Sequence, residues 1–301
     1  MAYLTLFTIP KGFVDPHVSL IQRNALASWQ ALGSEVEVLV MGDDPGVAEA
    51  AAEHGATHLG DPAKNEFGTP LLDWAFAEAA ARGSGEVLCY TNADIILLPD
   101  LLATARALRF PDYLAIGQRW DCDITEPIDF AERAATLRAW AHAHGKLDLG
   151  RGSDYFLFPR STAFDMPAFA VGRPGWDNWI MGRALELGMP LVDATEGITA
   201  IHQNHDYGHV SQRTGSDWEG PEADRNRRLG GWLERYLHTP ANATHVLSDG
   251  RPRPARSLRH LRARAEAFFA LAPSARPLRA LVRAFRSAQR ALRPRTAGSG
   301  I

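Results

Sequence analysis

Strand-like and helix-like segments alternate across the first 200 residues, and this feature constrains the fold of the chain most. Apolar runs rich in Val, Leu and Ile predict buried strands, and segments bounded by Pro or Gly predict the helices between them. The expected strands are 3–9, 35–42, 56–60 and 86–92, and the expected helices are 17–32, 45–55 and 70–83. Asp15 and Pro16 cap and open the first of these helices. This alternation predicts a mainly parallel sheet covered by helices on both faces.

The next hundred residues continue the pattern less regularly. We expect strands at 112–120, 154–159, 189–194 and 197–202, and helices at 128–145 and 178–188. The linkers between them are long and carry Trp, Asp, Arg and Gly. Long loops of this kind on a rigid sheet are the usual place for a functional site.

Charge divides the chain into unlike parts. Residues 251–301 hold thirteen arginines and one acid, a net charge of +12, while the remainder sums to −15. We expect a nucleotide and acceptor domain at 1–215, a connecting helical segment at 216–250 and an Arg-rich helical tail at 251–301. The helix expected at 278–293 has separate apolar and arginine faces, which fits either packing on its own domain or contact with anionic lipid. Nucleic acid is not an expected partner, because the core is acidic.

Several classes of protein lose their main support. The two cysteines, Cys89 and Cys122, form neither a disulfide framework nor a metal-ligand spacing. No apolar run reaches the length of a membrane span and no export leader is visible, so the cytoplasm, with an optional place on the inner membrane face, is the expected compartment. The dinucleotide, Walker and nucleophile-elbow motifs are absent.

The tripeptide Asn92-Ala93-Asp94 ends the strand at 86–92. Ligands of parallel sheets bind at the carboxyl ends of the strands, and a carboxylate there is a hard oxygen ligand suited to Mg²⁺ or Mn²⁺. A simple turn also explains an Asn and an Asp at a strand end. A second group, His202, His205 and His209, follows a late strand and offers imidazole ligands, although a polar loop accounts for it equally.

Asp177 stands between Trp176 and Trp179 at the start of a helix. A carboxylate flanked by aromatic rings is partly desolvated and could act as a general base, and tryptophan faces stack on sugars. Helix capping is the competing interpretation.

Two loops complete the set of candidates. Asn65, Gly68 and Thr69 precede a helix whose free amides could meet a phosphate or ribose, or which Thr69 simply caps. A Gly-Arg-Gly loop leads through Ser153 and Asp154 into the strand at 154–159, and either faces an acceptor or forms a tight turn.

Together these segments resemble the GT-A glycosyltransferase superfamily. The segments "TNADIILLPD", "GSDYFLFPR", "GWDNWI" and "HQNHDYGH" are similar to those of bacterial GT-A-like proteins, over about residues 3–215. The resemblance implies a GT-A-like, mostly parallel mixed sheet flanked by helices, with a basic helical extension at the C-terminal end. It departs from the family at Asn92, where the D-x-D motif usually has its first Asp, which puts the strength of metal binding in doubt.

The resemblance also implies roles for individual residues. Asp94 and His202 or His205 would hold Mg²⁺ or Mn²⁺, and Asp177 would match the base of inverting members. Six further residues are expected at the nucleotide sugar beside Asn92 and Asp94: Thr8, Pro10, Asp43, Asn65, Gly68 and Thr69. Five are expected at the acceptor: Trp120, Ser153, Asp154, Trp176 and Asn178.

The expected activity is transfer of a sugar from a nucleotide-diphosphate donor to a hydroxyl of a glycan or lipid-linked acceptor, with inversion favoured over retention. Two alternatives stay open. One is a sugar-phosphate nucleotidyltransferase, whose glycine-rich N-terminal loop is missing here. The other is an inactive protein of the same fold that binds carbohydrate or nucleotide.

Overall fold

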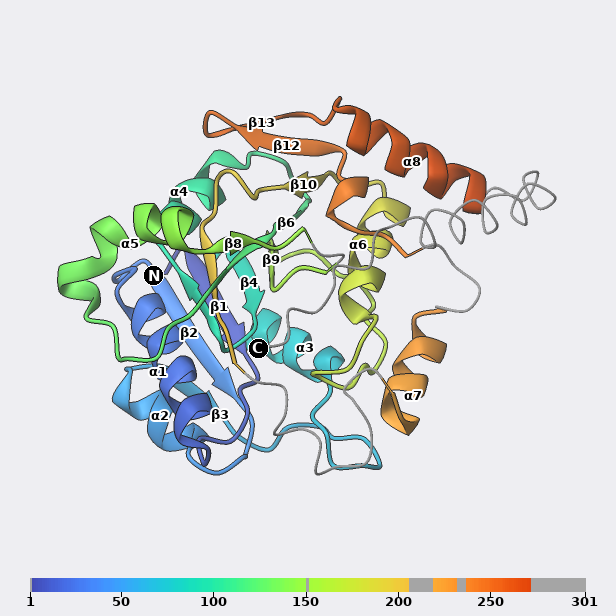
Figure 1. Cartoon of the computed structure of the whole chain (residues 1–301). Helices are drawn as coiled ribbons and strands as arrows, with labels where there is room; N and C mark the ends of the chain where they lie inside the picture. The colour runs from blue at the N-terminus through green and yellow to red at the C-terminus, as the bar shows by residue number, and fades with distance from the viewer. Residues whose placement is uncertain (1, 150–151, 206–218, 232–236, 272–301) are drawn as a thin grey trace, which may run out of the picture.

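The computed structural model describes residues 2–149, 152–205, 219–231 and 237–271 (Figure 1). Its main element is a nine-stranded sheet with the order β13-β12-β10-β6-β9-β4-β1-β2-β3. The strands are β1 (Leu4–Thr8), β2 (Val36–Met41), β3 (Thr57–Leu59), β4 (Val87–Thr91), β6 (Leu114–Ile116), β9 (Tyr155–Pro159), β10 (Leu191–Asp193), β12 (His245–Ser248) and β13 (Arg251–Pro254). Strand β9 runs antiparallel between β4 and β6, β13 runs antiparallel to β12, and the other pairs are parallel. The expected mixed, mostly parallel sheet is confirmed.

Helices cover both faces of this sheet, as predicted (Figure 1). One face packs on α1, α2 and α4, and the other packs on α3 and α6. On β4, Val87 and Cys89 point to the first face while Leu88 and Tyr90 point to the second, because side chains alternate along a strand. The helices are α1 (Pro16–Gln30), α2 (Val47–Glu53), α3 (Leu72–Arg82), α4 (Asp100–Ala107), α5 (Phe130–His144), α6 (Trp176–Glu186), α7 (Pro221–Leu229) and α8 (Leu258–Leu271), with a 3-10 turn, η2, at Pro240–Asn242.

A second, four-stranded sheet was not predicted. It has the order β5-β11-β7-β8, with β5 (Ile95–Leu97), β7 (Arg119–Cys122), β8 (Lys146–Leu147) and β11 (Ala200–Gln203). Its apolar side chains, such as Ile96 and Ile201, form a separate core with Leu137 and Ala141 of α5. The strand expected at 197–202 therefore belongs to this small sheet and not to the main one.

The single strand expected at 112–120 is two strands, β6 and β7, in different sheets. The chain breaks at Gly117, whose amide and carbonyl both bond to the Ser153 hydroxyl. The amide of Gln118 donates to Thr195 Oγ1 instead of to a neighbouring strand. A Cβ at Gly117 would collide with the Tyr155 hydroxyl, so glycine is required where the chain changes sheets.

The observed counterparts of the expected helices begin and end within about two residues of the expected bounds, and one of the differences has a clear local cause. Asp15 accepts from the amides of His17 and Val18 and so caps α1 as predicted. The helix expected from Thr69-Pro70 begins only at Leu72. Residues 63–71 form a closed turn instead, in which Asn65 and Thr69 bond to one another.

The C-terminal parts do not divide at residue 250. The segment expected to be a helical connector contains β12 as well as α7, and β13 continues the main sheet beyond it. The helix expected at 278–293 lies outside the described residues. Within the described ranges, no helix is long and apolar enough to cross a membrane.

Candidate functional site

Strand register brings three acidic or imidazole side chains together at one end of the small sheet. His202 on β11 is paired with Ile95 of β5 on one side and with Asp121 of β7 on the other. Asp94 directly precedes Ile95, so the turn after β4 carries it from the main sheet to the side of His202. Asp94 and His202, which are 108 residues apart in the sequence, therefore meet because β5 pairs with β11.

Asp94, His202 and His205 form a donor set for a divalent cation. Asp94 Oδ2 lies 3.2 Å from His205 Nε2 and 3.5 Å from His202 Nε2, and the three residues offer ligand atoms within 4.8 Å of one another. Asp94 Oδ1 and both ring nitrogens of His202 are buried and make no hydrogen bond of normal geometry to any described residue. Buried polar atoms left without a bond fit a ligand, and a carboxylate with imidazoles suits Mn²⁺ or a similar ion. His209 lies outside the described residues.

The electrostatics of this cluster keep Asp94 ionised. Burial alone would raise the pKa of Asp94, but the close contact and charge of His202 and the hydrogen bond and charge of His205 outweigh burial and hold that pKa far below its usual range. Burial lowers the pKa of His202, whereas the adjacent Asp94 raises it and leaves a net increase. An ionised carboxylate is the form that a cation needs.

Two neighbours that sequence reasoning missed surround this set. Asp121 Oδ1 lies 3.0 Å from His202 Nδ1, an arrangement that orients a metal-binding imidazole. Arg119 donates from Nε to Asp121 Oδ1 at 2.9 Å and from Nη1 to Asp154 Oδ2 at 3.0 Å. The i, i+2 spacing of Arg119 and Asp121 on one strand face was a visible signal, but only the pairing with His202 gives it meaning.

Asn92 and Asp154 are held together. The Asn92 side-chain amide donates to Asp154 Oδ1 at 2.8 Å, and the Asn92 backbone amide donates to the Asp154 carbonyl at 3.0 Å. An aspartate at 92 would place a carboxylate where Asp154 needs a donor. The asparagine at position 92 therefore has a structural reason.

Asp177 lies beside the same segment. It sits in the first turn of α6, whose N-cap is Gly175 at φ +101, so Asp177 is not the cap. A Cβ built on Gly152 would come within 2.5 Å of Asp177 Oδ2, which shows how closely the carboxylate approaches this backbone. Burial raises the pKa of Asp177 to about 6, the backbone amide of Asn178 opposes the shift and the charge of Asp154 adds to it. A carboxyl with a pKa near neutral is suited to proton transfer.

The residues expected at the nucleotide fall into two groups. Thr8, followed closely by Pro10, ends β1, and Asp43 follows β2, so both lie at the edge where parallel β4 ends just before Asn92. Thr8 Oγ1 is buried without a partner among the described residues, while Asp43 pairs with Lys64 Nζ at 2.6 Å.

The turn that contains Gly68 forms the second group and binds α7. Asn65 Nδ2 donates to Glu222 Oε1 at 2.8 Å, and Arg173 Nη2 donates to Glu222 Oε2 at 2.7 Å. Thr69 also bonds to Glu222 and does not cap α3. The structure thus gives Asn65 and Thr69 a clamping role between this turn and α7.

Of the five residues expected at the acceptor, Asp154 alone lies beside the donor set, where it contacts Arg119. The Ser153 hydroxyl hydrogen-bonds to the carbonyls of Gly117 and Tyr155. Trp176 packs against Tyr90 and Phe156 in the core. Trp120 points away from Arg119 and Asp121 and stacks on His142, with ring centroids 4.4 Å apart. These placements argue against direct acceptor contact by the three side chains.

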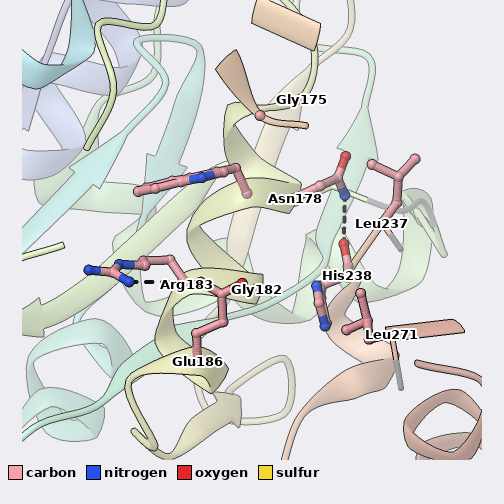
Figure 2. A pocket seen from close by; sticks show the side chains of 10 residues that line it. Gly175, Asn178, Gly182, Arg183, Glu186, Leu237, His238 and Leu271 are labelled. Carbon is pink, nitrogen blue, oxygen red and sulfur yellow. Dashed lines mark hydrogen bonds and ion pairs between the residues drawn. The ribbon is translucent and has the colours of Figure 1, made fainter. Parts of the chain in front are cut away.

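Asn178 faces a small pocket on the other side of α6. Figure 2 shows its amide pointing at the His238 carbonyl, to which it donates at 2.8 Å, with Gly182, Arg183 and Leu271 nearby. Asn178 is buried, so this bond anchors the segment at 237–238 to α6. It assigns the fifth expected acceptor residue a structural role.

Comparison with known proteins gave structural similarities alone. No family model and no curated protein matches the chain. Glucosyl-3-phosphoglycerate synthase from Mycobacterium tuberculosis, in complex with Mn²⁺, UDP and glucosyl-3-phosphoglycerate, is 14% identical over 70% of this chain and 75% of its own, with a TM-score of 0.43. The mannosyltransferase PcManGT from Pyrobaculum calidifontis, in complex with GDP-Man and Mn²⁺, is 14% identical over 97% and 81%, with a TM-score of 0.44. Because these identities and TM-scores are low, we interpret the site from its own geometry.

Proposed function

We propose that this protein is a glycosyltransferase that moves a sugar from a nucleotide-diphosphate donor to a hydroxyl acceptor and uses Mg²⁺ or Mn²⁺. One observation carries the proposal. An Asp-His-His donor set, in which His202 is buried and Asp94 and His205 are partly buried, and a separate carboxyl with a pKa near 6 lie around the same Asn92–Asp154 junction, where the main sheet meets the small one. A nucleotide diphosphate needs the first feature and a hydroxyl acceptor needs the second.

Each residue has a part in this reaction. Asp94, His202 and His205 would hold the cation, which when bound supplies positive charge to the diphosphate leaving group. Asp121 keeps the His202 imidazole in place. Thr8, Pro10 and Asp43 line the strand ends on the side expected for the nucleoside.

Asp177 accepts the proton of the acceptor hydroxyl. That hydroxyl then attacks the anomeric carbon from the face opposite the leaving group, which gives inversion. The oxygen gains the bond to carbon as the carbon–phosphate oxygen bond breaks, and the electron pair leaves with the diphosphate. A glycan or lipid-linked hydroxyl is the acceptor class that we propose.

The two alternatives predict different products. A sugar-phosphate nucleotidyltransferase releases pyrophosphate from a nucleoside triphosphate, and an inactive relative binds without turnover. Asn92 is the main argument for an inactive protein, because it replaces a carboxylate, but its bond to Asp154 gives it a structural role compatible with activity.

The test is hydrolysis of a panel of nucleotide sugars with and without Mn²⁺, together with the variant Asp94→Asn. We expect Mn²⁺-dependent release of nucleoside diphosphate by the wild-type protein and a loss of at least about 100-fold in the variant. Asp224→Asn is the matched control, since Asp224 is exposed and pairs with Arg227 on α7. Absence of turnover together with absence of a thermal shift by any nucleoside diphosphate would refute the proposal.

A further inference from the structure

The outward face of α8 is apolar, which is unusual for a helix at the edge of a protein. The inner face packs through the buried residues His260, Ala263 and Ala267. The Asn242 amide donates to the Ala263 carbonyl, and Arg264 donates to the carbonyls of Ala243 and Ala255. These contacts fix which side of α8 faces the protein.

Four large apolar side chains occupy the opposite side, at helical spacing. The exposed fractions are 82% for Leu258, 49% for Leu261, 68% for Phe268 and 46% for Phe269. We call these four residues the outer face. Single exposed apolar residues are ordinary, but four on one helical stripe mark a contact surface.

Positive charge accompanies the outer face. Residues 251–271 contain six arginines and one glutamate, a net charge of +5. Arg259 and Arg262 follow the two leucines by one position, so their side chains border the stripe. The hairpin of β12 and β13, which carries Arg251 and Arg253, lies at the same end of the molecule (Figure 1).

We propose that the outer face of α8 docks on an anionic lipid surface. Leucine and phenylalanine side chains enter the boundary between headgroups and acyl chains, while the bordering arginines meet lipid phosphates. Nucleic acid would use the arginines and leave the four apolar side chains without a role.

Two other occupants would bring like charges together. A second copy placed face to face through α8 would bring two basic segments together, each with a net charge of +5 over residues 251–271. Residues 272–301 of the same chain hold seven arginines and no acid, so they are positively charged, as is the segment around the outer face. Charge complementarity therefore favours an anionic membrane over either.

The experiment uses the full-length protein and sedimentation with vesicles of phosphatidylcholine mixed with phosphatidylglycerol, against vesicles of phosphatidylcholine alone. We expect binding to the anionic vesicles that weakens at least about tenfold in the variant Leu258→Ser/Leu261→Ser/Phe268→Ser/Phe269→Ser. Arg259→Gln/Arg262→Gln should weaken binding less, and added salt should weaken it in all proteins that bind.

The matched control is Val14→Ser/Leu149→Ser, which removes two side chains that are 74% and 69% exposed elsewhere. It should bind as the wild-type protein does. All four replaced side chains on α8 are exposed, and circular dichroism before and after heating checks that each variant stays folded.

Three results would overturn the proposal. The first is a wild-type protein that does not bind anionic vesicles. The second is a variant with the four serine substitutions that binds them as tightly as the wild-type protein does. The third is a wild-type dimer in solution that becomes a monomer in the variant, which would make the outer face an interface between copies. None of these readouts depends on sugar transfer.

Discussion

At the scale of single residues, Asp177 shows how burial prepares a carboxyl for chemistry. The pKa of about 6 means that the proton-accepting form becomes dominant only above that pH. We expect kcat/KM for transfer to rise with pH through about 6, and Asp177→Asn to lose at least about 100-fold in kcat. Initial rates across pH measure both.

The pH dependence of the free energy of unfolding provides a control for Asp177→Asn. The folded-state pKa of Asp177 lies above its unfolded value of 3.8, so the folded protein binds an additional proton between these two values. The protonated Asp177 carboxyl therefore contributes fully to the free energy of unfolding below about pH 4, and this contribution is lost as the pH rises through about 6. Asp177→Asn should match the wild-type protein near pH 4 and be more stable at pH 8, by up to about 3 kcal/mol. An inactive variant that is also less stable at pH 8 would contradict this account.

The residues of the candidate site were predictable to different extents. Asp94, His202 and His205 were expected as a metal set, and the structure places them together, although metal binding itself stays a prediction. Asp121 and Arg119 were missed because their importance comes from the register between β7 and β11. Ser153 and Trp176 were assigned to an acceptor from their neighbours in sequence, yet their side chains bond and pack inside the fold.

At the scale of elements, a buried pair of amides ties α1 to the donor set of Asp94, His202 and His205. Gln203 Nε2 donates to the carbonyls of Ile21 and Asp94, at 2.7 and 3.1 Å, and Asn24 Nδ2 donates to Gln203 Oε1 at 3.0 Å. Gln203 is completely buried. The backbone of Asp94 is thus held by a side chain at the end of β11.

We expect Gln203→Met to weaken Mn²⁺ binding about tenfold, measured by calorimetry, because the main chain of Asp94 loses its donor. Gln22→Met is the matched control. Gln22 is also buried on α1 and makes two bonds to the Lys11 backbone, far in sequence from the donor set. Both variants should lose about 1–3 kcal/mol of stability. An equal loss of Mn²⁺ affinity in both would remove Gln203 from this role.

Elements with strong local signals were predicted well. Asp15-Pro16 fixes the start of α1, and short apolar runs identify β1, β2 and β4. The direction and the pairing partners of a strand were not predictable. For example, β9 runs antiparallel between β4 and β6, and its own sequence does not specify those partners. The division of 112–120 into β6 and β7 depends on Ser153 and Tyr155, which lie more than 30 residues away.

At the scale of the whole molecule, the main sheet continues past residue 250. Strand β13 pairs with β12, and Arg264 of α8 bonds to the carbonyls of Ala243 and Ala255. A chain ending at residue 250 loses both. We expect it to melt at least about 4 °C below the full-length protein, whereas a chain ending at residue 271 should not. Equal melting temperatures for the two shortened chains, by calorimetry, would show that β13 and α8 add nothing.

The separation of charge has a consequence for how the molecule approaches a surface. The first 250 residues sum to −15, and the arginines of β13 and α8 lie at one edge of the sheet. Such a molecule has a permanent electric dipole. Near an anionic surface the field exerts a torque that turns the basic edge forward, within a range of about 10 Å at ordinary salt. The protein would therefore arrive already oriented, with its acidic body held away from the surface.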